Sequence, residues 1–516
     1  MNQEEIKKKQ KRVMIYVMII SLICVVGVSY AFFTAGMSSE TSTTVRADAG
    51  TMKITYSGGA NIDLAGIYPK DDVWATKTIT VTGNNTTDAE MYYKLTLVVD
   101  SNTFKTDDSL QYELVSTNTS TNGEIIPNIS KTDITGTSIE LGSGKFAKAN
   151  NASHTYELKI YYPKKATSQN ANQGATFSAH VEITSSKAPK TNGKLSELVL
   201  YNNEVKTPIT TPGAAISTAS EALLASTEDD YGTSYYFRGA VKNNYVEFAN
   251  KCWRIVRIVG GGSVKLVLHN DNTTGAANPC SSANNSTNAA FARYSGTTYT
   301  SAFNRNKDDN AYVGFMYGTA GASDYASAHA NTNKSTILTN LEAWYNNLKT
   351  YESVIADTVW CNDKTNVTDT SYDPWSITPN GRGYSKNVTY YGATQRLVSA
   401  SKSAGGTGPS LKCNGELSKI TSKVGLITAD ELAFAGYAYG TDNTTTYLQE
   451  NATDTYWWSL SPLDFYYGSA CVWSVSSGFF GDRNVDVNGA GRPSISLKST
   501  TNVTGNGTSE NPYKVV

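Results

Sequence analysis

The chain has 516 residues, enough for two or more domains that each bury a core of their own. Its 44 Lys and Arg residues against 45 Asp and Glu residues give a net charge of -1, which excludes the basic character typical of nucleic-acid-binding proteins. Only four histidines are present, so His-based catalysis and metal sites are disfavoured, and we expect no cofactor. The low content of charged residues (17%) and the 33 tyrosines indicate an extracellular, β-rich protein.

The N-terminal residues predict how the chain is oriented relative to a membrane. Residues 1–12 are basic and are expected in the cytoplasm, and residues 13–33 form an uncharged apolar stretch of about the 20 residues that span a bilayer. The alternative is a cleavable signal peptide, because Ser29-Tyr30-Ala31 has the form of a cleavage site. Both alternatives put the remainder of the chain outside, either anchored at the cell surface with its C-terminus outside or secreted.

Residues 45–186 carry the pattern of β-strands. Apolar residues alternate with polar ones from Tyr93 to Val99, from Tyr156 to Tyr162 and from Phe177 to Ile183. This period of two means that one face of each strand is buried and the other is in water. The pattern predicts an all-β antiparallel sandwich or barrel, which we interpret as a stalk.

The same region, with its leader, resembles the TasA/camelysin group of bacterial matrix-fibre proteins. The matching residues are Tyr30-Ala31-Phe32-Phe33, the stretch 47–64 and the turn Ile67-Tyr68-Pro69-Lys70-Asp71. The resemblance implies a jelly-roll sandwich, export by a dedicated signal peptidase and strand exchange between subunits. The long C-terminal extension departs from that group, and it favours a spacer over a fibre subunit.

Residues 187–228 are rich in Pro, Thr, Ser and Ala, a composition that predicts a linker without a core of its own. Within it, Leu195 to Tyr201 is a candidate for a short helix or strand. The head is expected at 229–516, with a hairpin over 252–268 and a long loop over 270–330.

Two helices are predicted in the head from their capping residues. Ser335 can cap a helix whose apolar residues recur at helical spacing, and Thr428 with Glu431 forms a capping box. We interpret Asp430 and Glu431 as residues of a helix start rather than as an acid–base pair.

Five cysteines lie outside the apolar stretch, an odd number that leaves one thiol over in an oxidising compartment. We expect Cys252 to pair with Cys280 and Cys361 with Cys413, which leaves Cys471 free. The alternative is that all five are reduced and only pack.

No motif for catalysis competes with a binding function. No His lies close in sequence to any extracellular Cys, and no G-x-S-x-G elbow occurs, so we expect no enzyme activity. Asn484-x-Asp486-x-Asn488 resembles the first half of an EF-hand loop, but Ile495 stands where the bidentate Glu is required. We therefore expect no metal site and interpret the stretch as an Asn/Asp-Gly turn; oxygen ligands for calcium from a lectin-like loop are the alternative.

The head resembles the C-type-lectin-like domains of bacterial surface proteins, a fold shared with formylglycine-generating enzymes. The pieces that carry the resemblance occur in order along the chain: 243–246 with 253–255, 344–345 with 361–363, 425–428, 456–462, 491–493, and 505–507 with 512–513. The resemblance implies an α+β C-type-lectin-like domain. The paired catalytic cysteines of the enzymes have no clear counterpart here.

Within this family, residues 463–491 resemble the variable region of proteins that bacterial retroelements diversify. There, Asn codons of a template are changed at their adenines, and the stretches 472–476 and 482–488 fit that form. Cys471 stands where the resemblance implies an Asn, and diversification of this codon would explain the odd cysteine count. The alternative is a constant, Tyr/Ser-rich loop of a lectin fold.

This segment combines an expected framework with an expected binding surface. The framework residues are Trp457, Trp458, Trp473, Arg492 and Pro493. Tyr, Ser and Asn are typical of antibody-like binding surfaces, and many large rings in one turn-rich stretch favour exposure. The predicted ligand-binding residues, expected to share one surface, are Tyr466, Tyr467, Ser469, Cys471, Ser474, Ser476, Phe479, Phe480, Asp482, Asn484, Asp486 and Asn488.

The sequence therefore predicts a cell-surface recognition protein. Its ligand is an unidentified extracellular protein, glycan or phage, it contacts the membrane through the N-terminal helix, and it binds no nucleic acid. The alternatives are a matrix-fibre component of the TasA type and a lectin-fold enzyme.

Overall fold

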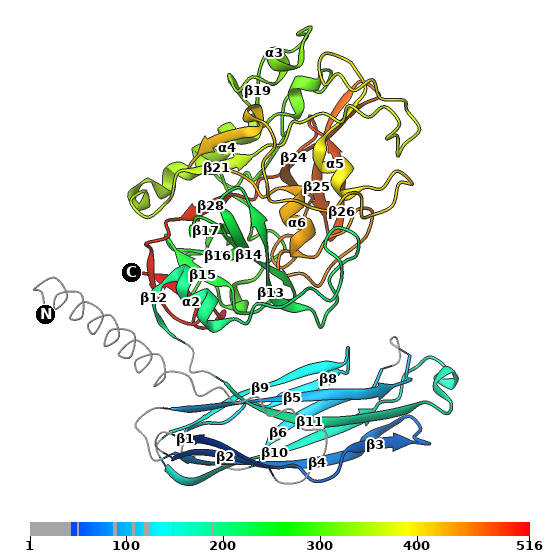
Figure 1. The fold of residues 1–516 in the computed structure, drawn as a ribbon, viewed down its shortest axis with the longest axis vertical. Coiled ribbons are helices and arrows are strands. Elements are labelled where there is room, and N and C mark those ends of the chain that lie inside the picture. The colour runs from blue at the N-terminus through cyan, green and yellow to red at the C-terminus, as the bar shows by residue number, and fades with distance from the viewer. Residues whose placement is uncertain are drawn as a thin grey trace, which may run out of the picture. The chain divides into compact units, whose positions relative to one another are not determined.

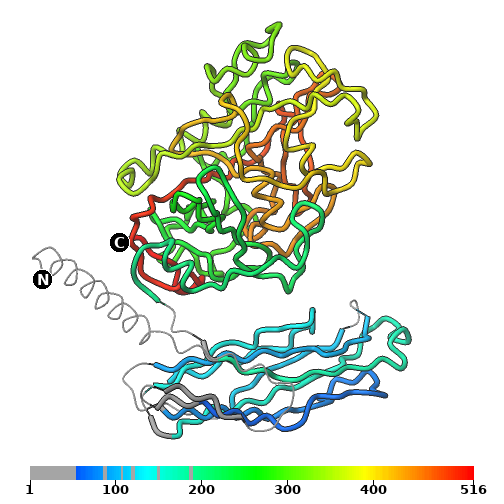
Figure 2. The backbone as a smooth tube through the Cα atoms, in the orientation of Figure 1, coloured from blue at the N-terminus to red at the C-terminus, as the bar shows by residue number. Residues whose placement is uncertain are grey.

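The computed structural model describes residues 43–48, 51–85, 90–105, 109–117, 123–147, 149–186 and 190–516 (Figures 1 and 2). The predicted segments 1–12 and 13–33 lie outside the described residues. Among the helices that are described, none is long and apolar enough to cross a membrane. The chain divides into two compact units, residues 1–188 and 189–516. The described part of the first consists largely of β-sheet, and the second combines β-sheets with short helices and irregular segments.

The first unit is built from two antiparallel sheets that form a sandwich (Figure 1). The alternation predicted for residues 93–99 is confirmed, because the apolar residues of that strand are buried and their neighbours are half-buried. One sheet has the order β1(Thr43–Asp48)-β2(Thr51–Ser57)-β4(Lys70–Asn85)-β10(Ala149–Tyr162)-β6(Gln111–Ser116)-β8(Ile129–Asp133). The other has the order β3(Ile62–Ala65)-β11(Thr176–Ser186)-β5(Met91–Asn102)-β9(Ser138–Phe146)-β7(Gly123–Glu124).

A polar contact joins the two sheets inside this apolar core. The Tyr93 hydroxyl of β5 lies 2.6 Å from Nδ1 of His154 on β10, and it also contacts the Tyr156 hydroxyl. Burial lowers the pKa of His154 to about 4, so the imidazole is neutral at pH 7. The core therefore holds a neutral hydrogen-bonded group between its layers rather than a charge.

The second unit, the head, contains two larger sheets, two small ones and several short helices (Figure 1). The first sheet follows β12(Asn192–Lys194)-β29(Asn502–Thr504)-β30(Tyr513–Val515)-β15(Tyr245–Phe248)-β16(Lys251–Ile258)-β14(Gly232–Gly239)-β13(Ala222–Asp229), with β17(Val264–Asn270) joining β16 to β28(Ser494–Leu497). The second follows β18(Thr300–Ser301)-β27(Gly489–Ala490)-β24(Trp457–Tyr466)-β25(Ser469–Ser476)-β26(Phe479–Asn484), with β22(Thr389–Tyr390) on β24. The small sheets pair β19(Met316–Tyr317) with β20(Asn333–Lys334) and β21(Thr358–Cys361) with β23(Lys419–Ser422).

The helices of the head begin where their capping residues predict. In α4 (Thr336–Tyr345) the Ser335 hydroxyl accepts from the Leu338 amide, and α6 (Ala429–Ala435) has the complete capping box of Thr428 and Glu431. The remaining helices are α2 (Leu195–Asn202), α3 (Tyr325–His329) and α5 (Gly392–Leu397). Much of the stretch 270–330 is irregular, as predicted, although Phe291, Phe303 and Phe315 anchor it in the core.

The predicted linker 187–228 differs from the structure. Its described part, from residue 190, belongs to the head, because β12 pairs with β29 near the C-terminus and β13 pairs with β14. Glu221, inside the expected linker, is fully buried and its carboxylate accepts from Nε of Arg238 at 2.9 Å. The amino-acid composition suggested a linker because this stretch has no core of its own. In the structure its residues pair with distant parts of the head instead.

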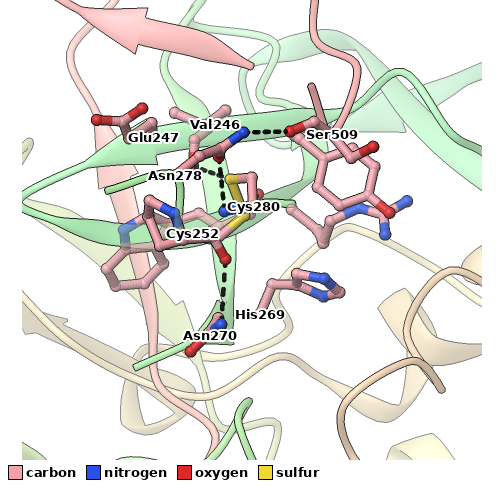
Figure 3. The surroundings of a disulfide bond; sticks show 12 residues. Val246, Glu247, Cys252, His269, Asn270, Asn278, Cys280 and Ser509 are labelled. Atoms are coloured by element: carbon pink, nitrogen blue, oxygen red, sulfur yellow. Dashed lines mark hydrogen bonds between the residues drawn. A yellow bond between two sulfur atoms is a disulfide. The ribbon is translucent and has the colours of Figure 1, made fainter. Parts of the chain in front are cut away.

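Both expected cysteine pairs are present as disulfides, and Cys471 is free and buried. Cys252–Cys280 attaches the irregular stretch after β17 to β16, an inner strand of the first sheet (Figure 3). Around it, the Asn278 side chain donates to the Ser509 carbonyl at 3.1 Å and the Asn270 side chain donates to the Pro279 carbonyl at 3.1 Å (Figure 3). This disulfide therefore fixes a loop with little regular structure.

Replacing Cys252 and Cys280 together by serine is expected to destabilise the head by about 2 to 4 kcal/mol, because the cross-link restricts the unfolded chain across a separation of 28 residues. Urea unfolding of the full chain, followed by tryptophan fluorescence, measures the change. An unchanged midpoint would show that the hydrogen bonds of the loop suffice without the cross-link.

Candidate recognition site

The segment singled out from the sequence forms three consecutive strands of the second head sheet, joined by two-residue turns. Tyr467 and Gly468 connect β24 to β25, and both have positive φ, of 47° and 69°. Ser477 and Gly478 connect β25 to β26, again with positive φ, of 48° and 105°. Such turns match the twist of a hairpin, but they are unfavourable for a residue as large as Tyr467.

The five predicted framework residues are all buried, and they tie this sheet to the rest of the head. The Trp458 indole donates to the Ser301 carbonyl at 3.0 Å. The Arg492 guanidinium donates to the Leu268 and Leu448 carbonyls, and it lies 4.9 Å from the ring of Trp457. These large buried side chains therefore hold the three strands in a fixed position within the head.

The predicted binding residues do not all share one surface. The two turns lie at opposite ends of β25, roughly 23 Å apart at about 3.3 Å per residue. Tyr467 is at one end and is 85% exposed, whereas Phe479 is at the other and is 39% exposed. The expectation that these two rings form one patch is therefore wrong.

The register also divides the residues between the two faces of the sheet. Cys471 pairs with Asn484, and Trp473 pairs with Asp482, so these four share a face, and Asp464 of β24 joins it opposite Cys471. We call the end of this face next to the Tyr467 turn the recognition face; its residues are Asp464, Tyr466, Ser469, Cys471, Asp482 and Asn484. Ser474, Ser476 and Phe479 point to the opposite face, and the ring of Phe479 there lies over Gly481.

Three residues predicted to be at the surface are buried. Phe480 is fully buried, with its ring centre 4.6 Å from that of Trp473 and 5.9 Å from that of Tyr437. Ser474 is 2% exposed because its face is covered, and Cys471 is 7% exposed, with its sulfur 3.2 Å from Oδ1 of Asn484. Of the remaining predicted residues, Tyr467, Phe479, Asp482 and Asn488 are exposed, and Tyr466, Ser469, Ser476, Asn484 and Asp486 are half-buried.

The structure adds a residue that the sequence analysis missed. Asp464 is only 5% exposed, and one oxygen of its carboxyl group has no hydrogen-bond partner. Burial, followed by the charge of Asp482, raises its pKa well above the usual value. The sequence does carry a signal, since Asp464 is the lone carboxylate of the buried strand β24.

The stretch that resembles half an EF-hand loop is used for other contacts. Asn484 accepts from Cys471, and the Asp486 carboxylate lies 3.3 Å from the ammonium group of Lys307. Across the described residues, no group of three or more His, Cys, Asp or Glu side chains is arranged to hold a metal ion.

A second polar cluster lies in a pocket between α6 and the first head sheet. Glu431 contacts both Arg257, at 2.8 Å, and Lys265, at 2.7 Å, while Arg396 contacts Asp430 at 2.7 Å. Each charge has an opposite partner, and Glu431 also completes the helix cap. We therefore interpret these residues as ion pairs that support the structure, and not as a second functional site.

No known domain family and no curated protein matches this chain.

Proposed function

We propose that this chain is a cell-surface ligand-binding protein. In this proposal an N-terminal membrane or signal helix precedes a jelly-roll stalk of the TasA/camelysin type, and a C-type-lectin-like head presents the recognition face. The observation that carries the proposal is the Tyr467 turn, a large aromatic ring exposed on a rigid hairpin beside polar side chains. Exposed aromatic residues on rigid supports are typical binding hot spots.

The division between a buried frame and replaceable positions also supports diversification of residues 463–491 by a retroelement. Tyr466, Tyr467, Ser469, Asp482 and Asn488 all have side chains that reach solvent, so other residue types fit there without loss of the core. Cys471 and Phe480 do not, and we expect less variation at these two positions.

Deep sequencing of this locus in a growing bacterial population tests the diversification. Substitutions are expected to trace to adenines of a template repeat, to fall in the solvent-reaching codons, and to leave the codons for Trp457, Trp458 and Arg492 unchanged. An invariant locus without a neighbouring template repeat and reverse transcriptase would leave the head as a fixed binding domain.

Substituting Tyr467 by alanine is expected to weaken binding about 30-fold, as for a central hot spot, while stability changes by less than about 0.5 kcal/mol. The full chain, displayed on cells, is panned against glycan arrays and a random-peptide phage library, and the selected ligands are titrated against the variant. The matched control is Tyr231→Ala, since Tyr231 is 60% exposed on the turn between β13 and β14. Equal losses in both variants would contradict the proposed site.

A further inference from the structure

A chain of aromatic rings begins beside Asp464 on the recognition face. Tyr390 of β22 is the residue opposite Asp464 in the sheet, and the Trp375 ring lies 5.1 Å from that of Tyr390. Tyr439 continues the chain of rings, at 6.2 Å from Trp375 and 5.8 Å from Trp473. Trp375 and Tyr439 remain partly exposed, so the rings reach solvent.

Two carboxylates, those of Asp464 and Asp482, lie close together at this place. Asp482 is exposed and close enough to Asp464 to raise the pKa of its carboxyl group. Within the described part of the chain, neither carboxylate has an ion pair with Lys or Arg. The nearest basic residue in sequence, Arg483, points to the opposite face, where its guanidinium lies 5.2 Å from the Tyr456 ring.

Asp464 is therefore a poor structural residue at this position. Its buried oxygen without a partner leaves hydrogen-bonding capacity unused, and the side chain shares a face with Cys471 and Asn484 rather than with a cation. A positive group from outside would contact both carboxylates and the faces of the partly exposed rings, and it would remove the penalty on the charged form of Asp464.

We propose that the Asp464 cluster, defined as Asp464 and Asp482 with the partly exposed rings of Trp375 and Tyr439, binds the cationic end of a basic side chain of a protein or peptide ligand. The buried rings of Tyr390 and Trp473 hold Trp375 and Tyr439 in place. The inference rests on the proposed binding function of this face and names its ligand chemistry. Carboxylates supply the opposite charge, and aromatic faces supply cation–π attraction.

Three small probes test the ligand chemistry on the full chain. They are Nα-acetyl-arginine amide, Nα-acetyl-lysine amide and Nα-acetyl-citrulline amide, the neutral isostere of the arginine probe, titrated against the tryptophan fluorescence of the protein. At least one cation is expected to bind at least 10-fold more tightly than citrulline, and the tighter of the two identifies a guanidinium or an ammonium as the preferred group. Equal affinities for citrulline and both cations would overturn the proposal.

Two variants place the effect at the cluster. Asp464→Asn keeps the shape of the side chain and is expected to abolish the preference for cations, and Asp482→Asn, at an exposed position where folding is not at risk, is expected to reduce it 3- to 10-fold. The control Asp357→Asn removes the same charge from an exposed residue that pairs with Lys423, and it is expected to change nothing. A preference for cations that survives both cluster variants would overturn the proposal.

The random-peptide selection separates this inference from the proposed function. Peptides enriched on the wild-type chain are expected to contain Arg or Lys, and the Asp464→Asn chain is expected to lose them. Enriched peptides that are neutral or acidic and depend on Tyr467 would overturn the cation site while supporting the binding function. A library in which nothing is enriched, together with a failure of all three probes to bind, would count against both.

Discussion

Replacing Glu431 by glutamine is expected to destabilise the head by about 3 to 5 kcal/mol, because it breaks a buried ion pair and leaves a cation without its partner. Glutamine is nearly the same size, and its carbonyl oxygen can still accept the hydrogen bond that the Thr428 amide donates at 2.9 Å, so the helix cap remains. Arg257 retains Asp229, at 2.7 Å, as a partner. Lys265, in contrast, is 4% exposed and loses the carboxylate that its ammonium contacts.

The buried ion pair between Glu431 and Lys265 also makes the stability of the head depend on pH, and stability is lost as the pH falls. Burial opposes the charged form of Glu431, but Lys265 and Arg257 outweigh it and lower the pKa of the carboxyl group to about 2, from an ordinary value of 4.5. Stability from this group is therefore fully present above pH 4.5 and is lost as the pH falls towards 2. Burial lowers the pKa of Lys265 to about 8, so the lysine stays charged throughout this window.

Urea unfolding of the full chain at pH 7 and at pH 3 measures both effects. Seven of the eight tryptophans lie in residues 189–516, so their fluorescence follows the head. The difference between wild type and Glu431→Gln should shrink at pH 3. The double variant Glu431→Gln with Lys265→Met should recover part of the loss, since an apolar side chain needs no partner. If the stability difference between wild type and Glu431→Gln were the same at both pH values, and the double variant recovered none of it, the loss would come from the helix cap and not from the ion pair.

Local chemistry made several elements of the fold predictable. The alternation in residues 93–99 and the caps at Ser335 and Thr428 depend on neighbouring residues, and each is present in the structure. The disulfide partners were also expected correctly, and the tryptophans of the framework are buried.

What could not be predicted depends on contacts between distant segments. The sequence places Phe479 and Phe480 next to each other, and a strand must turn them to opposite faces, but only the register shows which face is covered. The cover comes from Tyr437, about 40 residues earlier in the chain. Asp464 was missed for the same reason, because its aromatic neighbours Trp375, Tyr390 and Tyr439 come from three separate segments.

Phe480 and Phe479 give the sharpest test of this register. Phe480→Ala is expected to cost about 3 to 5 kcal/mol, because it removes a fully buried ring and leaves a cavity beside Trp473. Phe479→Ala is expected to cost less than about 1 kcal/mol, because a ring that is 39% exposed gives up much less buried area. Urea unfolding of the two variants under identical conditions gives the comparison.

The comparison between the two variants shows which residues of β26 can vary without loss of the core. A large loss at position 480 with a small one at 479 means that recognition near this turn uses only the outward residue, and that Phe480 belongs with the tryptophans of the framework. Comparable losses would mean that both rings are core, and equally small losses would mean that β26 does not pack against Trp473. Because β26 is the edge strand beside β25, equally small losses would also place Asp482 away from Asp464 and remove one of the two carboxylates on which the cation site depends.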